Sequence, residues 1–193
     1  IVKLALDYLE AEKQRSPFEV CGFEQEVEYE IEGQTIRLVI DRIDRLPDGQ
    51  EVIIDYKTGK VKPDHWFGEP PQEPQLPLYA ISAPTPPAAV VYAVIREDGC
   101  VFKGIVSGEG LFPGLPQSGK RQEHLAEAGR DLPGTTAHWK VLLHRLMAEF
   151  LSGEARVQPR QGRAGCKSVF CELQPLCRID ERESLQLAEG DEA

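Results

Sequence analysis

Apolar and polar residues alternate along residues 36–46 and again along residues 51–57, and the turn Pro47-Asp48-Gly49-Gln50 joins the two segments. Period-two alternation on both sides of a Pro/Asp/Gly turn predicts a β-hairpin. On the second strand, Asp55 shares a face with Ile53 and Lys57. On the first strand, the alternation predicts two faces, Val39, Asp41 and Ile43 against Leu38, Ile40 and Arg42.

The hairpin can therefore bring Asp41 close to Asp55, with Lys57 next along the same edge. Two carboxylates and an ammonium at the ends of apolar strands are costly to bury unless something binds there. Mg²⁺ takes oxygen ligands, typically one or two carboxylates together with water and substrate phosphate. A lysine beside such a metal can orient the attacking water. We therefore expect a site for Mg²⁺ or Mn²⁺ at this edge.

Helical spacing predicts a helix over residues 1–15, and we expect its apolar stripe to face inward: Ile1, Val2, Ala5, Leu6 and Leu9. Residues 18–31 alternate as a strand, with Phe23, Val27, Tyr29 and Ile31 on one face and glutamates on the other. A short helix is expected from residue 74, a buried strand over 88–95 and its hairpin partner over 100–106. The last clear helix covers 135–153, with a core stripe of Trp139, Leu142, Leu143, Leu146, Met147 and Phe150.

Three short motifs, here called sequence words, lie on these elements in this order: Asp41-Arg42-Ile43-Asp44, Asp55-Tyr56-Lys57-Thr58-Gly59 and Gln75-Leu76-Pro77-Leu78-Tyr79. Together they resemble the RecB-like branch of the PD-(D/E)XK nuclease superfamily, which includes the AddB and Cas4 nucleases. The resemblance implies an α/β fold, a restriction-endonuclease-like αβββαβ core with a central mixed β-sheet flanked by helices.

The same resemblance assigns roles to individual residues. Asp41 and Asp55 would bind the metal, and Lys57 would position and activate water. Gln75 and Tyr79, four residues apart on one helical face, would face the metal site; otherwise Tyr79 is core and Gln75 surface. Glu24 is a further candidate metal ligand, with a solvated strand glutamate as the alternative.

Cysteines crowd into residues 166–178, where Cys166, Cys171 and Cys177 precede an arginine. In AddB- and Cas4-like nucleases three cysteines at this end belong to a [4Fe-4S] cluster, whose fourth ligand lies upstream of the core. The first spacing here is longer than in the family, and Cys21 does not match the upstream ligand. We therefore expect the three cysteines to converge on a cluster that is incomplete in this chain; four thiolates would also suit zinc.

Direct contacts with DNA are expected from two loops. The polar, proline-rich segment 60–74 carries Trp66, which could stack on a base. Residues 114–120 match the first seven places of a phosphate-binding loop, but the eighth place holds Arg121 and Pro116 would remove a backbone donor. We read this second segment as an exposed loop in which Lys120 and Arg121 lie near DNA.

The chain has 193 residues and a formal net charge of -10, which is unfavourable for a protein that grips phosphates alone. We expect a nuclease domain over residues 1–178, excised from a longer chain because it opens in mid-helix without Met, and an acidic, flexible tail over 179–193. Helicase or other domains would supply much of the grip on DNA. No signal peptide or membrane span is visible, and the cysteines do not form a secreted disulfide pattern. We expect a cytoplasmic protein.

These observations predict a Mg²⁺- or Mn²⁺-dependent deoxyribonuclease, acting as an exonuclease on single-stranded DNA or duplex ends in double-strand-break repair. Two alternatives stay open. One is a nuclease-like module that binds DNA or a partner without cleaving. The other is a zinc-stabilised interaction domain in which the C-terminal cysteines are the essential feature.

Overall fold

A computed structural model describes residues 2–108, 110–115, 131–156, 166, 172 and 174–177 of the chain. The chain divides into two compact units, Ile1–Ala148 and Glu149–Ala193. The first unit contains the whole β-sheet. The second contains the short helix α6 (Gln174–Cys177). The division falls inside the range expected to form one domain, and the tail expected at 179–193 lies outside the described residues.

Five strands form one sheet in the order β1-β2-β3-β4-β5. Their bounds are β1 (Glu19–Ile31), β2 (Gln34–Arg45), β3 (Glu51–Lys57), β4 (Ala89–Arg96) and β5 (Gly99–Val106). All neighbours are antiparallel except β3 and β4, which run parallel. A parallel pair needs a crossover connection, and here it contains the 3-10 helix η1 (Pro63–Trp66) and helix α2 (Gln75–Ser82). The expected αβββαβ order and mixed sheet are confirmed.

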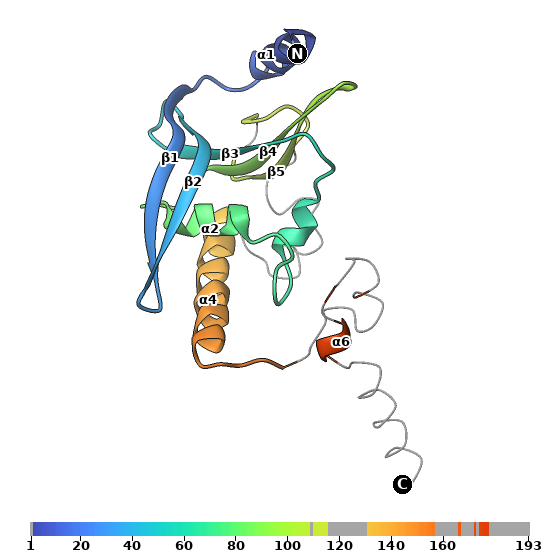
Figure 1. Ribbon diagram of the computed structural model, residues 1–193. Coiled ribbons are helices and arrows are strands. Elements are labelled where there is room, and N and C mark those ends of the chain that lie inside the picture. Colours follow the sequence, from blue (N-terminus) through green and yellow to red (C-terminus); the bar gives the residue numbers. More distant parts are fainter. Residues whose placement is uncertain are drawn as a thin grey trace. The chain divides into compact units, whose positions relative to one another are not determined.

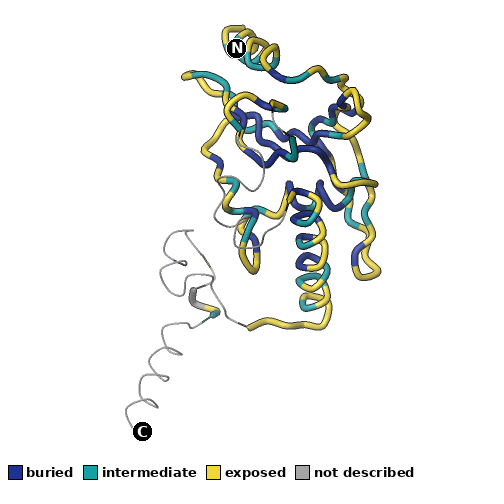
Figure 2. The backbone as a smooth tube through the Cα atoms, turned by 180° about the vertical axis from the view of Figure 1, so that it is seen from behind, coloured by how far each residue is buried: buried dark blue, intermediate teal, exposed yellow. Residues whose placement is uncertain are grey.

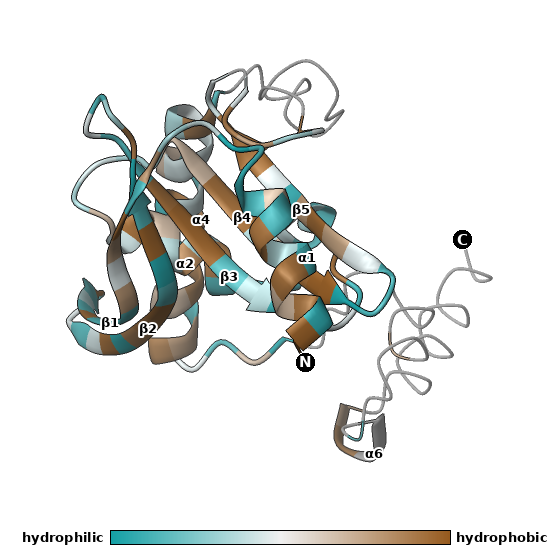
Figure 3. Ribbon diagram, turned by 90° about the horizontal axis from the view of Figure 1, so that it is seen from above, coloured by the Kyte–Doolittle hydropathy of each residue, from teal (hydrophilic) through white to brown (hydrophobic). Residues whose placement is uncertain are grey.

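Helices cover both faces of the sheet. Figure 1 shows α1 (Val2–Glu12) on one face, and α2 with the first part of α4 (Leu132–Leu151) on the other. The central strands β3 and β4 are therefore buried, which Figure 2 shows as dark blue tube and Figure 3 as brown ribbon. This explains why β4 is an apolar run with no alternation. Within the described residues, no helix is long and apolar enough to span a membrane.

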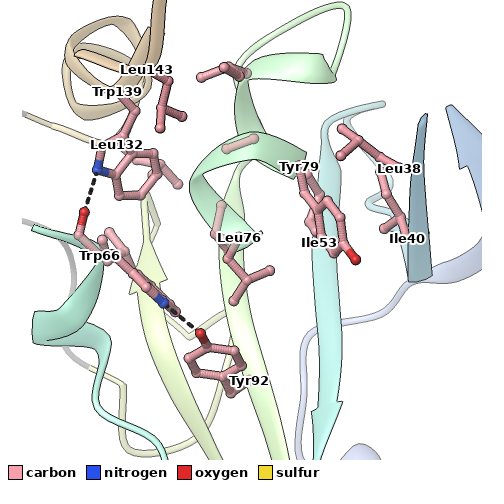
Figure 4. Close-up of a cluster of buried hydrophobic side chains, with 14 of the residues drawn as sticks. Leu38, Ile40, Ile53, Trp66, Leu76, Tyr79, Tyr92, Leu132, Trp139 and Leu143 are labelled. Carbon is pink, nitrogen blue, oxygen red and sulfur yellow. Dashed lines mark hydrogen bonds between the residues drawn. The ribbon is translucent and has the colours of Figure 1, made fainter. Parts of the chain in front are cut away.

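The core on the α2 side is built around two tryptophans. Trp66 is 0% exposed; its indole Nε1 donates to the Tyr92 hydroxyl at 2.8 Å, and its carbonyl accepts from Trp139 Nε1 at 3.1 Å (Figure 4). The segment 60–74 is therefore anchored to both β4 and α4. Helix α4 begins earlier than expected because the Asp131 carboxylate accepts the Gly134 N–H at 2.8 Å and so caps its first turn.

The expectation that the apolar stripe of α1 faces inward is wrong. Val2, Leu6 and Leu9 are exposed, whereas Tyr8 and Ala11 pack against the core. Polar bonds decide this orientation, because the Tyr8 hydroxyl and the Glu12 carboxylate both bind the Arg42 guanidinium, at 2.7 Å each. Phe150, expected in the core stripe of α4, is also exposed.

Strict alternation also fails in β1 and β2. Leu38 and Ile40 belong to the hydrophobic cluster on the α2 side, and Ile43 packs against the same cluster. Strict alternation would place even-numbered and odd-numbered residues of β2 on opposite faces, so the alternation is interrupted between Ile40 and Ile43. The switch lies where Glu24 of β1, with φ 47°, stands level with Asp41 of β2. An added Cβ on Gly22 would meet the Ile43 side chain at 3.2 Å, so the next residue, Phe23, points to the opposite face and is 68% exposed. Such irregularities re-aim side chains.

Candidate active site

Three neighbouring strands carry the polar side chains of the candidate site. The β2–β3 register pairs Arg42 with Ile54, so that Asp41 and Asp55 come next where the two strands part. In the parallel pair, Asp55 lies beside Tyr92 of β4. Paired positions present their side chains on the same face of a sheet. The fold therefore places Asp41, Asp55 and Tyr92 side by side on the face that α2 covers.

The Asp41 carboxylate ends the hairpin ladder. Its Oδ2 accepts the backbone N–H of Tyr56 at 2.9 Å, one residue past Asp55 on β3. Asp41 itself is only partly buried. One oxygen therefore fixes the carboxylate against β3, next to Asp55, while the group keeps contact with solvent.

Asp55 is fully buried and incompletely paired. Lys57 Nζ lies 2.6 Å from Oδ2 as an ion pair, but neither oxygen has a hydrogen-bond partner among the described residues, and Oδ1 has no ion-pair partner there either. Burial raises the pKa of Asp55; the Lys57 ammonium opposes this, and the charges of Asp41 and Glu73 add to the rise. A buried carboxylate oxygen without a donor is costly, so this oxygen marks a place where a ligand would stabilise the fold.

A chain of hydrogen bonds connects Lys57 to α2 and β2. Lys57 Nζ donates to Gln75 Oε1 at 3.0 Å, Gln75 Nε2 donates to the Tyr79 hydroxyl at 2.8 Å, and that hydroxyl donates to the Val39 carbonyl at 2.6 Å. Burial is the largest cause that raises the pKa of Tyr79, so the hydroxyl keeps its proton. Gln75 and Tyr79 lie on one helical face as expected, and together they orient the lysine.

Sequence reasoning missed a second group of polar residues beside the site. Glu73, just before α2, accepts a hydrogen bond from the Tyr92 hydroxyl at 3.0 Å and contacts His65 Nδ1 at 3.0 Å. The ring of Tyr92 lies 5.7 Å from Lys57 Nζ. The available signal was Tyr92 itself, a residue with a hydroxyl inside an otherwise apolar strand.

The donor set fits a hard divalent cation. No group of three or more His, Cys, Asp or Glu side chains that could hold a metal occurs among the described residues. Mg²⁺, however, usually takes one or two carboxylates and completes its shell with water and substrate oxygens. Asp41 and the unpaired oxygen of Asp55 meet that requirement. Glu24 is exposed, and no polar contact in the described part of the chain connects it to either aspartate.

The DNA-contact residues expected from the sequence fare differently. Trp66 cannot stack on a base, because its side chain is completely buried against Tyr92 and Trp139. That expectation is wrong: in segment 60–74 the large aromatic residue anchors the loop instead of extending into solvent. Lys120 and Arg121 lie outside the described residues.

The cysteine segment belongs to the second unit. Cys166 is buried and Cys177 is partly buried, in α6, while Cys171 lies outside the described residues. Convergence of the three sulfurs therefore stays a prediction.

Comparison with known proteins gives one family. A sequence model of the PD-(D/E)XK nuclease superfamily matches residues 1–178. The search of curated proteins finds no match to the chain. The matched range includes the aspartates, the lysine, helix α2 and the cysteine segment.

Proposed function

Because the chain belongs to the PD-(D/E)XK nuclease superfamily, we propose that it hydrolyses DNA phosphodiester bonds with Mg²⁺ or Mn²⁺. Members of this superfamily are generally metal-dependent nucleases. The residues proposed to carry the reaction are Asp41, Asp55, Lys57, Gln75 and Tyr79.

The observation that carries this proposal is the state of Asp55. Its carboxylate is fully buried, and among the described residues it has the Lys57 ammonium as its ion-pair partner while Oδ1 has no donor. A purely structural carboxylate at this depth is expected to have its oxygens paired. The unpaired oxygen, with Asp41 beside it, supports a cation as the missing partner.

In the proposed mechanism Asp41 and Asp55 would hold the cation. When bound, it supplies Lewis-acid polarisation of the scissile phosphate and lowers the pKa of water near it. Lys57 orients the attacking water with its ammonium, which Gln75 holds in place. Tyr79 fixes Gln75 by accepting from its amide and anchoring on the Val39 carbonyl.

The test is digestion of end-labelled single- and double-stranded DNA, with Mg²⁺ or Mn²⁺ and with a chelator. We expect cleavage that needs the cation and is lost in Asp55→Ala and in Lys57→Ala. Cation-dependent digestion that persists undiminished in Asp55→Ala protein would overturn the assignment. The pattern of labelled products also separates exonuclease from endonuclease cleavage.

The finer assignment rests on the three sequence words around the site. We propose a RecB-like exonuclease that works in double-strand-break repair, together with a helicase or with other domains of a longer protein. The net charge of -10 supports the need for partners, since the chain alone offers little attraction to phosphates. Cleavage of a long duplex that becomes processive only when a helicase is added would support this role.

The cysteine segment carries a second part of the proposal. We propose that Cys166, Cys171 and Cys177 supply three ligands to an iron–sulfur cluster, and that this chain holds the cluster poorly because a fourth thiolate is missing. Metal analysis with an absorption spectrum tests this. A brown protein with four iron atoms would show a complete cluster, and a colourless protein with stoichiometric zinc would show a zinc site instead.

A further inference from the structure

Glu73 is a carboxylate beside the candidate site that belongs to none of the three sequence words. Its side chain is 38% exposed, so its presence needs no buried counter-charge. Both of its oxygens are nevertheless held, one by the Tyr92 hydroxyl and the other by His65. A half-exposed glutamate fixed at both oxygens is unusual for a residue that only solubilises a loop.

The donor and acceptor roles of the Tyr92 hydroxyl are fixed by its two partners. The indole N–H of Trp66 is a donor only, so the tyrosine oxygen accepts from it at 2.8 Å (Figure 4). The hydroxyl proton is then left for Glu73 Oε2, 3.0 Å away. Glu73 Oε2 is consequently the acceptor of this hydrogen bond.

The loop around His65 provides the second anchor. The His65 carbonyl accepts the backbone N–H groups of Gln72 and Glu73, at 2.8 and 3.1 Å. His65 also precedes the buried Trp66, so the loop cannot drift from the sheet. The negative charge of Glu73 is thus held at a fixed place.

The Glu73 carboxylate is connected to the neighbourhood of Asp55 through the side chain of Tyr92. Tyr92 is the direct neighbour of Asp55 in the β3–β4 ladder, and Glu73 lies at the far end of the Tyr92 side chain. The Asp55–Lys57 ion pair is neutral as a unit, which leaves Asp41 as the main local attraction for a cation. An additional fixed negative charge would change that balance.

We propose that Glu73 is a positioning residue of the cation site: held by Tyr92 and His65, its charge raises the affinity for a divalent cation without coordinating it. The inference rests on the proposed function, because it requires a cation at Asp41 and Asp55. It accounts for two features that the sequence words do not explain, the hydroxyl of Tyr92 within an apolar strand and the bonding of Glu73 at both oxygens.

The test is isothermal titration of MnCl₂ into the chain at low ionic strength, in the absence of DNA. Glu73→Gln keeps the size of the side chain and removes its charge, so we expect Mn²⁺ affinity to fall about fivefold. Glu69→Gln is the matched control, since Glu69 lies in the same segment but pairs with Arg145 at 2.7 Å. The control should bind as the wild type does. The difference should shrink as salt is added, while thermal stability in chelator stays the same.

Equal Mn²⁺ affinity of Glu73→Gln and wild-type protein would overturn the inference. If Glu73→Gln does not fold, Tyr92→Phe decides instead: it releases one tether of Glu73 and should weaken binding about twofold, whereas unchanged affinity overturns the inference. Asp55→Asn separates the two levels of the account. If Asp55→Asn protein binds Mn²⁺ as tightly as the wild type does, the proposed function itself is contradicted, and the inference falls with it.

Discussion

Asp44 and Asp55 are fully buried carboxylates on adjacent strands of one hairpin, and they face opposite sides of the sheet. Asp44 lies on the α1 side. Its Oδ1 accepts from Arg42 Nε at 2.6 Å, and its Oδ2 accepts from Arg15 at 2.7 Å and from Arg42 at 3.1 Å. Asp55 lies on the α2 side, with one lysine beside one oxygen and no donor for the other.

The surroundings of the two aspartates differ in the same way. Around Asp44, Glu12 completes a network of two carboxylates and two guanidinium groups, with bonds to both arginines. Burial alone would lower the pKa of Arg42, but the hydrogen bonds to Asp44 and Tyr56 raise it instead. Around Asp55, burial wins over the single lysine and the pKa of the acid rises. Both oxygens of Asp44 are therefore paired without a ligand, and the network holds α1 in place, whereas Asp55 keeps an oxygen without a donor.

The largest expected effect of breaking this contrast is on stability. Asp44→Ala removes the buried carboxylate that both arginines share and leaves the two guanidinium groups with Glu12, so the free energy of unfolding should fall by about 3–5 kcal/mol. Urea unfolding measures the loss. Asp55→Ala in chelator should lose far less, because its carboxylate is incompletely paired already. Equal losses for the two variants would remove the distinction between them.

Activity should show the reverse order. Asp55→Asn keeps the shape of the side chain but should lower DNA cleavage on the order of 10²-fold or more, because the cation loses a carboxylate. Its circular dichroism spectrum should match that of the wild type. Substantial cleavage by Asp55→Asn, together with an intact fold, would place the chemistry elsewhere.

Stabilisation by the cation should depend on Asp55, on the α2 side of the sheet. A ligand that binds only the folded state at a hundred times its dissociation constant adds about 2.7 kcal/mol of stability. We expect Mg²⁺ or Mn²⁺ to raise the melting temperature of wild-type protein and of Glu69→Gln, but not of Asp55→Asn. A shift of the same size in Asp55→Asn would mean that the ions bind at other carboxylates.

The smallest effect should come from the bonds that orient Lys57. Tyr79→Phe removes the hydroxyl that accepts from Gln75 and donates to the Val39 carbonyl. Gln75 is then held less firmly, so the position of the Lys57 ammonium should become less well defined. Cleavage should fall roughly tenfold, an amount of about 1.4 kcal/mol in the barrier, with little change in Mn²⁺ affinity. Tyr29→Phe, which alters a hydroxyl bound to His144 at 3.0 Å, is the control and should cleave normally.

Local patterns were enough to predict the central hairpin and some of the contacts between residues of the candidate site. The alternation around the Pro47–Gln50 turn predicts the β2–β3 hairpin, and the β3 alternation places Asp55 and Lys57 on one face. The spacing of Gln75 and Tyr79 on a helix likewise agrees with their contact in the structure. These features depend on neighbours in the sequence.

What could not be predicted depends on contacts between distant segments. The orientation of α1 follows from bonds between Tyr8, Glu12 and Arg42, which no helical periodicity reveals. The faces of Phe23, Leu38 and Ile40 follow from the irregularity at Glu24. Glu73 joins the site through Tyr92, 19 residues further along the chain, so no motif contains both.

The most direct test of the central claim is a crystal structure grown with Mn²⁺ and measured at the manganese absorption edge. We predict an anomalous peak about 2.2 Å from Asp55 Oδ1, with the Asp41 carboxylate as the second protein ligand and Lys57 turned toward the adjacent water. A structure with Mn²⁺ in the crystal but no peak at Asp55, or with peaks only at the exposed glutamates of β1, would contradict the account.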